Sequence, residues 1–201
     1  MQDAGGWENR DTAERFAEYA DVVFRALGDQ VPVWLTVNKP KTVVQNGYIW
    51  GHHAPGIRDE DAAYLVAHHL QLAHGLAVQA LPRLRSHRRI GPALQPAPLL
   101  PGRRLRRVGR RDQLHDGYEN RLYLDSIFRA YPQDVLDDLG PDSRMVRGVR
   151  DGDLKIISSP VDLLAVQYYT PLYVTRPRHG PQVAHLQAGG SRSTRRACTT
   201  S

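Results

Sequence analysis

A largely apolar run from Val31 to Val37 ends in Asn38-Lys39-Pro40, and this run constrains the fold of the chain more than any other feature. Such a run is typical of a strand covered on both faces, as in parallel sheets flanked by helices. Pro40 has no N–H for a sheet ladder and fixes its own φ, so the strand stops before it. The run therefore predicts a buried strand that delivers Asn38 and Lys39 to the edge of a sheet.

Segments with helical spacing alternate with strand patterns along the rest of the chain. The expected elements are a helix over about 12–27, the strand over 31–37, a helix from Asp59 or Asp61 to about Leu84, a strand over 89–95, a helix over 120–128, a helix from Pro132 and a strand over 161–169. Asp11 and Glu14 match a capping box for the first helix.

Three strands that alternate with helices imply an α/β fold with a parallel sheet and right-handed crossovers. Polar residues follow two of these strands, which is where βα-barrels place their sites, so we expect a partial (β/α)8 TIM barrel. At 201 residues the chain is long enough for one core but shorter than the roughly 250 residues of a complete barrel.

The net charge of +6 comes from two short segments that contain arginine and no acid. They hold Arg103, Arg104, Arg106, Arg107, Arg110 and Arg111 in the first and Arg176, Arg178, Arg192, Arg195 and Arg196 in the second. Such blocks can neutralise nucleic-acid phosphates, but no aromatic residues are interleaved for base stacking, so a nucleic-acid partner is disfavoured. We favour the hypothesis that both blocks are out-of-frame translation of a GC-rich gene, which continuous family-like sequence at the locus would support.

Cysteine and hydropathy bound the class of protein further. Cys198 is the single cysteine, which excludes an internal disulfide and Cys-based zinc patterns and agrees with a cytoplasmic location. No signal-peptide pattern follows Met1, and no apolar run approaches the ~20 residues of a membrane helix, so the expected chain is soluble. His68, His69 and His74 are spaced for packing rather than for metal ligation on one helix face.

Short motifs along the chain occur in an order that matches one enzyme family. They are Gly5-Gly6-Trp7, Asn9-Arg10-Asp11-Thr12-Ala13, Trp34-Leu35-Thr36-Val37-Asn38, His52-His53-Ala54-Pro55-Gly56, His68-His69, Ala73-His74-Gly75, Asn120-Arg121, Leu124-Asp125, Tyr131-Pro132 and Tyr168-Tyr169-Thr170-Pro171. Over about 1–95 and 117–175 the chain resembles glycoside hydrolase family 1, the β-glucosidases. The resemblance implies the third helix to the sixth strand of that family's barrel.

The resemblance also divides the chain. Residues 1–175 correspond to an incomplete family 1 barrel, in which 97–116 is an atypical Arg/Pro-rich, insert-like segment. Residues 176–201 are expected to be a disordered basic tail, because they lack Ile, Met, Phe, Trp and Tyr altogether.

The family's mechanism gives the strand ends a meaning. Its members hydrolyse β-glucosides with retention, using two carboxylates about 5–5.5 Å apart. Lys39 occupies the position of the acid/base glutamate, Asn38 that of a residue that binds the sugar, and Tyr169 that of a tyrosine that orients the nucleophile. Gln167 departs from the Asn of the family's Asn-Tyr-Tyr motif, and nothing matches the Thr-Glu-Asn-Gly motif of the nucleophile.

The resemblance therefore implies a β-glucosidase-type hydrolase of carbohydrate metabolism, with a β-glucoside or oligosaccharide substrate and no cofactor or metal. We expect this chain to be inactive, because a lysine ordinarily holds its proton at neutral pH and the nucleophile strand is missing. The alternative is a non-catalytic remnant, either a sugar-binding or an interaction module. No motif points to a particular sugar, aglycone or oligomeric state.

Overall fold

The computed structural model of the chain describes residues 1–81, 88–101 and 110–174. In chain order the elements are α1 (Asp11–Leu27), β1 (Val33–Asn38), α2 (Pro40–Thr42), α3 (Glu60–Ala80), β2 (Arg89–Leu94), β3 (Leu99–Pro101), α4 (Arg110–Asp116), α5 (Leu122–Phe128), α6 (Gln133–Leu139), α7 (Arg144–Gly148), α8 (Asp153–Ile157), β4 (Ala165–Val166) and β5 (Leu172–Val174). Short 3₁₀ turns precede α1 at Gln2–Ala4 and Gly6–Glu8, and π-helical segments lie at Val43–Ile49 and Gly117–Arg121.

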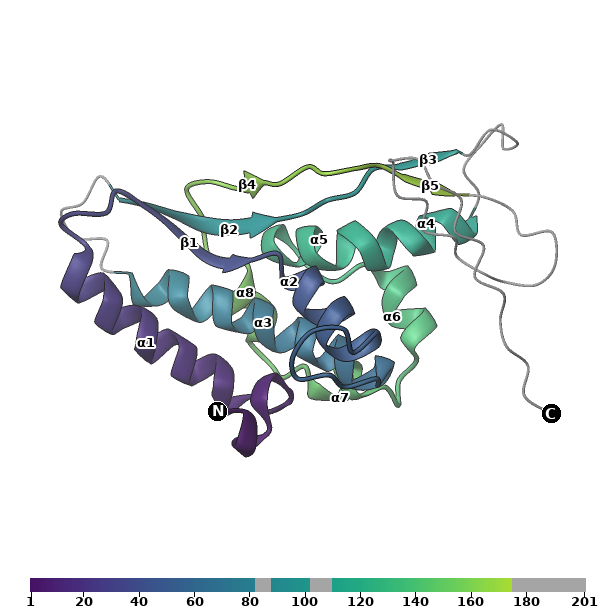
Figure 1. Cartoon of the computed structure of the whole chain (residues 1–201), viewed down its shortest axis with the longest axis horizontal. Helices are drawn as coiled ribbons and strands as arrows, with labels where there is room; N and C mark the ends of the chain where they lie inside the picture. Colours follow the sequence, from purple (N-terminus) through teal and green to yellow (C-terminus); the bar gives the residue numbers. More distant parts are fainter. Residues whose placement is uncertain (82–87, 102–109, 175–201) are drawn as a thin grey trace.

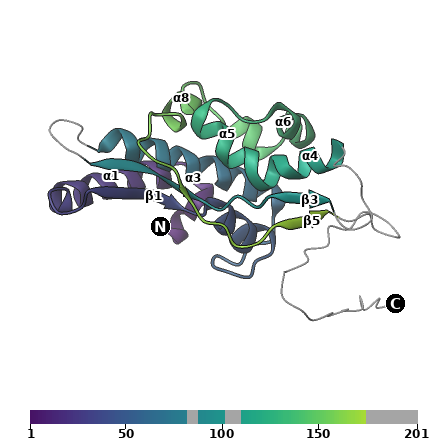
Figure 2. The same ribbon diagram turned by 90° about the horizontal axis from the view of Figure 1, so that it is seen from above.

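A parallel sheet lies over a layer of helices (Figure 1). Its strand order is β1-β2-β4, with Trp34 opposite Ile90 and Leu94 opposite Val166. Figure 2 shows β3 and β5 continuing beyond β2 and β4 as a second, two-stranded parallel ladder. The predicted α/β class and the parallel pairing of the strands are confirmed, and the described strands do not close into a barrel.

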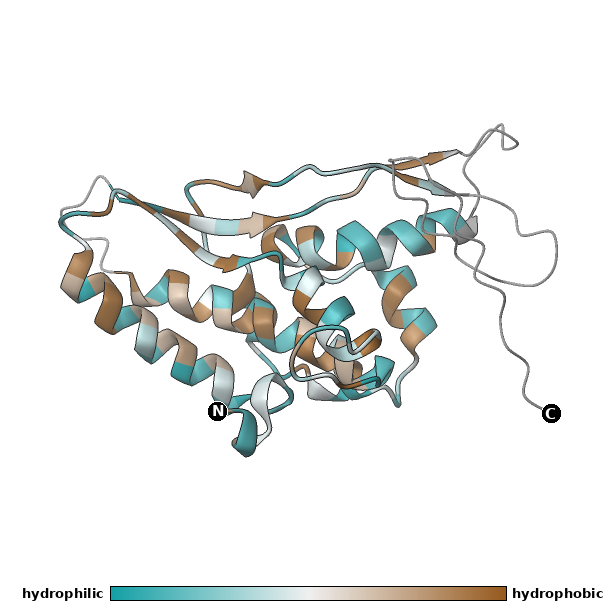
Figure 3. Ribbon diagram, viewed as in Figure 1, coloured by the Kyte–Doolittle hydropathy of each residue, from teal (hydrophilic) through white to brown (hydrophobic). Residues whose placement is uncertain are grey.

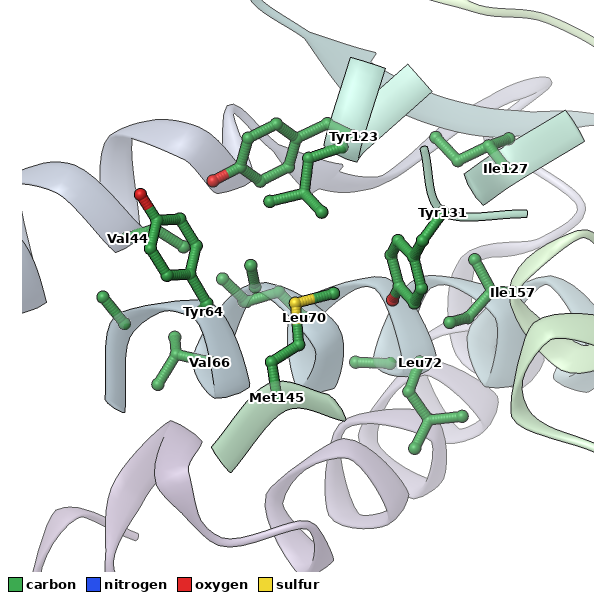
Figure 4. Packing of buried hydrophobic residues seen from close by; sticks show 14 of the residues in the cluster. Val44, Tyr64, Val66, Leu70, Leu72, Tyr123, Ile127, Tyr131, Met145 and Ile157 are labelled. Atoms are coloured by element: carbon green, nitrogen blue, oxygen red, sulfur yellow. The ribbon is translucent and has the colours of Figure 1, made fainter. Parts of the chain in front are cut away.

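Helix α3 forms the centre of the core. Its N-cap is Asp59, whose side chain accepts a hydrogen bond from the Ala62 amide at 3.0 Å. Of the two predicted starts of this helix, Asp59 and Asp61, the structure has the first. Apolar side chains of the surrounding helices pack on it from several sides (Figure 4). The main cluster includes Val44, Tyr64, Val66, Leu70, Leu72, Tyr123, Ile127, Tyr131, Met145 and Ile157.

The start of α1 differs from the predicted capping box. The N-cap is Arg10 rather than Asp11, and the Asn9 side chain accepts from the Asp11 amide at 3.0 Å. The reason is that the chain arrives through the 3₁₀ turn at Gly6–Glu8, so that Arg10 already has helical dihedral angles. The prediction placed the cap one residue too late.

The prediction that β1 is covered on both faces is wrong for the described residues. Val33 is 39% exposed and Leu35 is 49% exposed, while Trp34 packs edge-on against Phe24 of α1 with ring centroids 4.9 Å apart. Helices α1 and α3 cover only one face of the strand, and its alternate side chains point to the other. Figure 3 accordingly shows hydrophobic residues on the strands as well as on α3.

The strand predicted over 161–169 is shorter than expected. Only Ala165–Val166 pair regularly with β2. Ahead of them, Asp162 brackets Ile90: its amide donates to the Ile90 carbonyl at 2.9 Å, and its carboxylate accepts from the Ile90 amide at 3.0 Å. A side chain takes the place of a ladder partner there, and the regular strand starts only afterwards.

Part of the expected organisation lies outside the described residues. The arginines at 103–107 and the segment 176–201 belong to the stretches without description, as does the predicted end of the second helix at Leu84. In the rest of the chain no helix is both long enough and apolar enough to cross a bilayer.

Candidate functional site

The carboxyl ends of β1, β2 and β4 meet at one edge of the sheet. There the Lys39 amide donates to the Ala93 carbonyl at 2.8 Å, and the Gln167 amide donates to the Leu94 carbonyl at 2.8 Å. These bonds hold the residues that follow β1 and β4 on either side of the end of β2. In parallel α/β folds this edge is where ligands bind.

Lys39 adopts a left-handed backbone conformation, with φ of 51°, directly after the strand. Apart from glycines it is the one described residue with positive φ. The next residue, Pro40, is buried and begins α2, so the turn is fixed by a residue with restricted φ. Strained non-glycine positions of this kind cluster at functional sites.

The Lys39 side chain reaches from β1 to the chain after β4. Its Nζ donates to the Tyr169 hydroxyl at 3.4 Å and lies 5.3 Å from the centroid of the Tyr169 ring. A cation within about 6 Å of a ring centroid is attracted by the ring face. The structure thus brings together two of the three predicted site residues.

Asn38, the third, joins them through Gln167. The Asn38 Oδ1 accepts from Gln167 Nε2 at 2.5 Å, and Gln167 Oε1 accepts from the Tyr169 hydroxyl at 3.4 Å. Asn38, Gln167, Tyr169 and Lys39 therefore form a continuous chain of side-chain contacts between two strands. We call these four residues the strand-end cluster.

A buried ion pair lies behind the strand-end cluster. Lys41 Nζ is 3.0 Å from Glu119 Oε2, Gln45 donates to the other oxygen of Glu119 at 2.7 Å, and both charged side chains are 8% exposed. No sequence pattern indicates this pair, because Lys41 lies in the turn after the predicted strand and Glu119 is one acid next to a helical segment. Both residues border a mainly apolar cavity of about 130 Å³ that also contacts Leu94, Tyr123, Leu164 and Val166.

The strand-end cluster differs from a carboxylate pair in its charge. Its one ionisable group other than the Tyr169 phenol is a lysine, and Glu119, the nearby acid, has both oxygens engaged by Lys41 and Gln45. General acid catalysis by a carboxyl group is therefore not available from the four residues of the cluster. They can instead donate hydrogen bonds and offer a positive charge.

The histidines lie in the scaffold. His68 contacts the Tyr131 hydroxyl at 2.9 Å and Asp153 Oδ2 at 3.0 Å, and His74 contacts the Thr36 hydroxyl at 2.6 Å. Burial lowers the pKa of both imidazoles to about 4. These contacts agree with the predicted packing role. Within the described ranges, no three His, Cys, Asp or Glu side chains are grouped as a metal site would need.

Two of the tryptophans and the loop histidines have contacts of a different kind. Trp7 packs near Phe16, with ring centroids 6.1 Å apart, and Trp50 lies 6.0 Å from the ring of His52. His52 and His53 are exposed in the loop that follows the π-helical segment Val43–Ile49.

Comparisons with known proteins give a consistent result. The family model described as Glycosyl hydrolase family 1 matches residues 1–197. Beta-glucosidase A of Acetivibrio thermocellus is 36% identical over 175 residues, which are 87% of this chain and 39% of that protein. Thermostable beta-glucosidase B of Thermobispora bispora is 41% identical over 175 residues, covering 85% of this chain and 34% of that protein.

A solved structure agrees with these relatives. The crystal structure of psychrophilic beta-glucosidase BglU from Micrococcus antarcticus superposes with a TM-score of 0.80 at 36% identity, covering 90% of this chain and 39% of that one. The chain thus spans about two fifths of the length of the proteins that it matches.

Proposed function

The chain belongs to glycosyl hydrolase family 1, and from this membership we propose that the strand-end cluster is a β-glucoside-binding site that has lost its acid/base. In this proposal Asn38 and Tyr169 contact the sugar, and Lys39 stands where the family's acid/base glutamate would be. The observation that carries the proposal is the position of Lys39 at the end of β1, with its Nζ against Tyr169.

The chemistry of retention supports the loss of activity. One carboxyl group must protonate the leaving oxygen and then activate water, and the second must form the glycosyl-enzyme. A lysine in the first position ordinarily holds its proton at neutral pH, so it cannot take up the proton of the attacking water as a carboxylate does. Losing general acid/base catalysis costs roughly 10²–10⁴-fold in rate. The 201 residues also contain no Thr-Glu-Asn-Gly sequence, which the resemblance assigns to the nucleophile. We infer that this chain does not turn over β-glucosides.

A sugar-binding or interaction module is the second candidate. It is favoured by the contacts of Gln167, which hold Asn38 and Tyr169 together without any carboxylate. Asn38 Nδ2 donates to no described residue in this arrangement, so that it is available to a sugar hydroxyl.

The remaining expectations belong to the same proposal. Residues 1–175 would form the incomplete barrel, with 97–116 as an atypical insert and 176–201 as a basic tail. The cytoplasm is the proposed location, on the ground that a single cysteine offers no internal disulfide. A β-glucoside or oligosaccharide is the proposed ligand, and a nucleic-acid partner is not proposed.

Two assays test the two parts of the proposal. Release of nitrophenol from an aryl β-glucoside should stay at the rate of the uncatalysed control for the wild-type chain and for Lys39→Gln. Turnover by the wild type that Lys39→Gln abolishes would show that Lys39 acts in catalysis and would overturn the inactive assignment. A nuclear magnetic resonance (NMR) titration with methyl β-glucoside should shift the amide signals of Asn38 and Lys39, and unchanged signals at saturating sugar would exclude the sugar site.

A further inference from the structure

We propose that the strand-end cluster binds a small oxyanion, the carboxylate or phosphate group of a sugar-sized ligand, through Lys39 Nζ and the Asn38 amide. The inference rests on the proposed function only for the place of the ligand. It adds a ligand class that a site with an acid/base glutamate would repel.

The first argument is the charge of Lys39. Among the described residues no carboxylate lies within ion-pair distance of its Nζ, whose described contacts are the Tyr169 hydroxyl and ring. Lys41, two residues further along the chain, is paired with Glu119 at 3.0 Å. The two lysines are thus in different states: one charge is neutralised inside the protein, and the other faces a site whose side chains are neutral.

The second argument is that the possible competitor is engaged. Glu119 accepts from Lys41 on one oxygen and from Gln45 on the other, and its side chain is 8% exposed. Moving that carboxylate to Lys39 would leave the Lys41 ammonium buried without a partner, which is costly. An anion that neutralises Lys39 therefore has to come from a ligand.

The third argument is the direction of the hydrogen bonds in the cluster. Gln167 donates to Asn38 Oδ1, which uses one of the two lone pairs of that oxygen, while the two N–H groups of the amide remain for a ligand. Lys39 Nζ has one weak bond of 3.4 Å to the Tyr169 hydroxyl, and an ammonium has three donors. Adjacent residues, Asn38 and Lys39, thus present more open donor groups than open acceptor sites.

The backbone that carries the Lys39 side chain is held in place on both sides. The left-handed backbone at φ of 51° is followed at once by the buried Pro40, and the Lys39 amide is bonded to Ala93 at 2.8 Å. The Tyr169 ring covers one side of the ammonium at 5.3 Å. The ammonium keeps donors besides its bond to the Tyr169 hydroxyl, and a charge-assisted hydrogen bond from them to phosphate or carboxylate is about twice as strong as one to a neutral oxygen.

An NMR titration with inorganic phosphate tests the proposal. At low ionic strength the amide signals of Asn38 and Lys39 should shift in a saturable way, and glucose 6-phosphate and glucuronate should follow the same path as phosphate. Lys39→Gln should bind phosphate about tenfold more weakly, and Lys39→Arg should stay close to the wild type, because it retains the charge. Salt should weaken binding by screening.

Lys155→Gln is the matched control. Lys155 is exposed on α8, away from the sheet edge, so this variant has the same net charge as Lys39→Gln without touching the cluster. Equal affinity of Lys39→Gln and the wild type would overturn the proposal, as would equal losses in Lys39→Gln and Lys155→Gln, which would indicate a general charge effect.

The two ligands keep this inference separate from the proposed function. Binding of methyl β-glucoside without binding of phosphate would overturn the oxyanion site and leave the sugar site standing. Binding of phosphate without binding of methyl β-glucoside would retain the oxyanion site and overturn the glucoside assignment.

Discussion

Replacing Asp153 by Asn is expected to destabilise the fold by about 3–5 kcal/mol, because it removes the carboxylate from a buried ion pair. Its oxygens accept from the Arg10 guanidinium at 2.8 and 2.5 Å, from His68 Nε2 at 3.0 Å and from the Arg150 amide at 2.8 Å. Asp153 is 1% exposed. An amide of the same shape can retain part of these bonds but leaves the Arg10 charge without a partner.

The pKa of Asp153 gives an independent magnitude. Burial alone would raise the pKa, but the hydrogen bonds from Arg10 and from the Arg150 amide lower it from 3.8 to about 2. A difference of this size is worth about 2.5 kcal/mol at neutral pH. Because the folded-state pKa is the lower one, this stability is present above about pH 4 and is lost as the pH falls towards 2. The uncompensated guanidinium adds to it in the variant.

Urea unfolding at pH 7, followed by circular dichroism, measures the effect. With a slope of about 2 kcal/mol/M, the midpoint of Asp153→Asn should fall by about 2 M. Asp134→Asn is the matched control, because Asp134 also accepts two bonds from an arginine, Arg121, but its side chain is 43% exposed. Exposed pairs contribute less than about 1 kcal/mol. Equal losses in the two variants would refute the argument from burial.

Four further results are expected from the same structure. Burial lowers the pKa of His68 and of His74 to about 4, so the unfolded chain binds protons before the folded chain does as the pH falls below 6.5. The free energy of unfolding, measured with urea, should therefore fall by about 2 kcal/mol per histidine between pH 7 and 5. Glu119→Gln should cost about 3 kcal/mol in urea unfolding, because a buried lysine ammonium loses its carboxylate. Gly91→Ala should lower the thermal midpoint by about 10 °C, since the added Cβ would overlap the backbone carbonyl of Leu163, just before β4. Lys39→Glu should leave the free energy of unfolding within about 0.5 kcal/mol of the wild type, and a larger loss would show that Lys39 supports the fold.

The helices were the most predictable part of the fold. Asp59 could be read as the start of α3, because its side chain satisfies a free amide of the first turn whatever the rest of the chain does. The helix beginning after Pro132 was predictable for a similar local reason, and α6 starts at the next residue. Local rules suffice where the partner group is a few residues away.

Burial and ion pairing depended on segments distant in the sequence. The apolar run of β1 correctly predicted a parallel strand. Whether Leu35 is covered, however, depends on which elements lie over that face of the sheet. Likewise, Lys41 and Glu119 are separated by 78 residues, and no periodic pattern links them. The candidate site residues were assigned only by resemblance, since the polar strand end itself predicts an edge of the sheet and no particular chemistry.

The strand end at Asn38 and Lys39 separates what holds the fold from what determines chemistry. The ladder bond of the Lys39 amide to Ala93 uses the backbone, so it forms with any residue that tolerates the turn. The side chain faces a half-exposed edge, where a change of charge alters few packed contacts, whereas the buried charge of Glu119 cannot change without a compensating change at Lys41. We therefore expect that a family 1 scaffold can keep its α3-centred core while the charge at this strand end, the proposed acid/base position, reverses. The partial exposure by which we expect Lys39 to be dispensable for folding would also leave its ammonium accessible to a ligand.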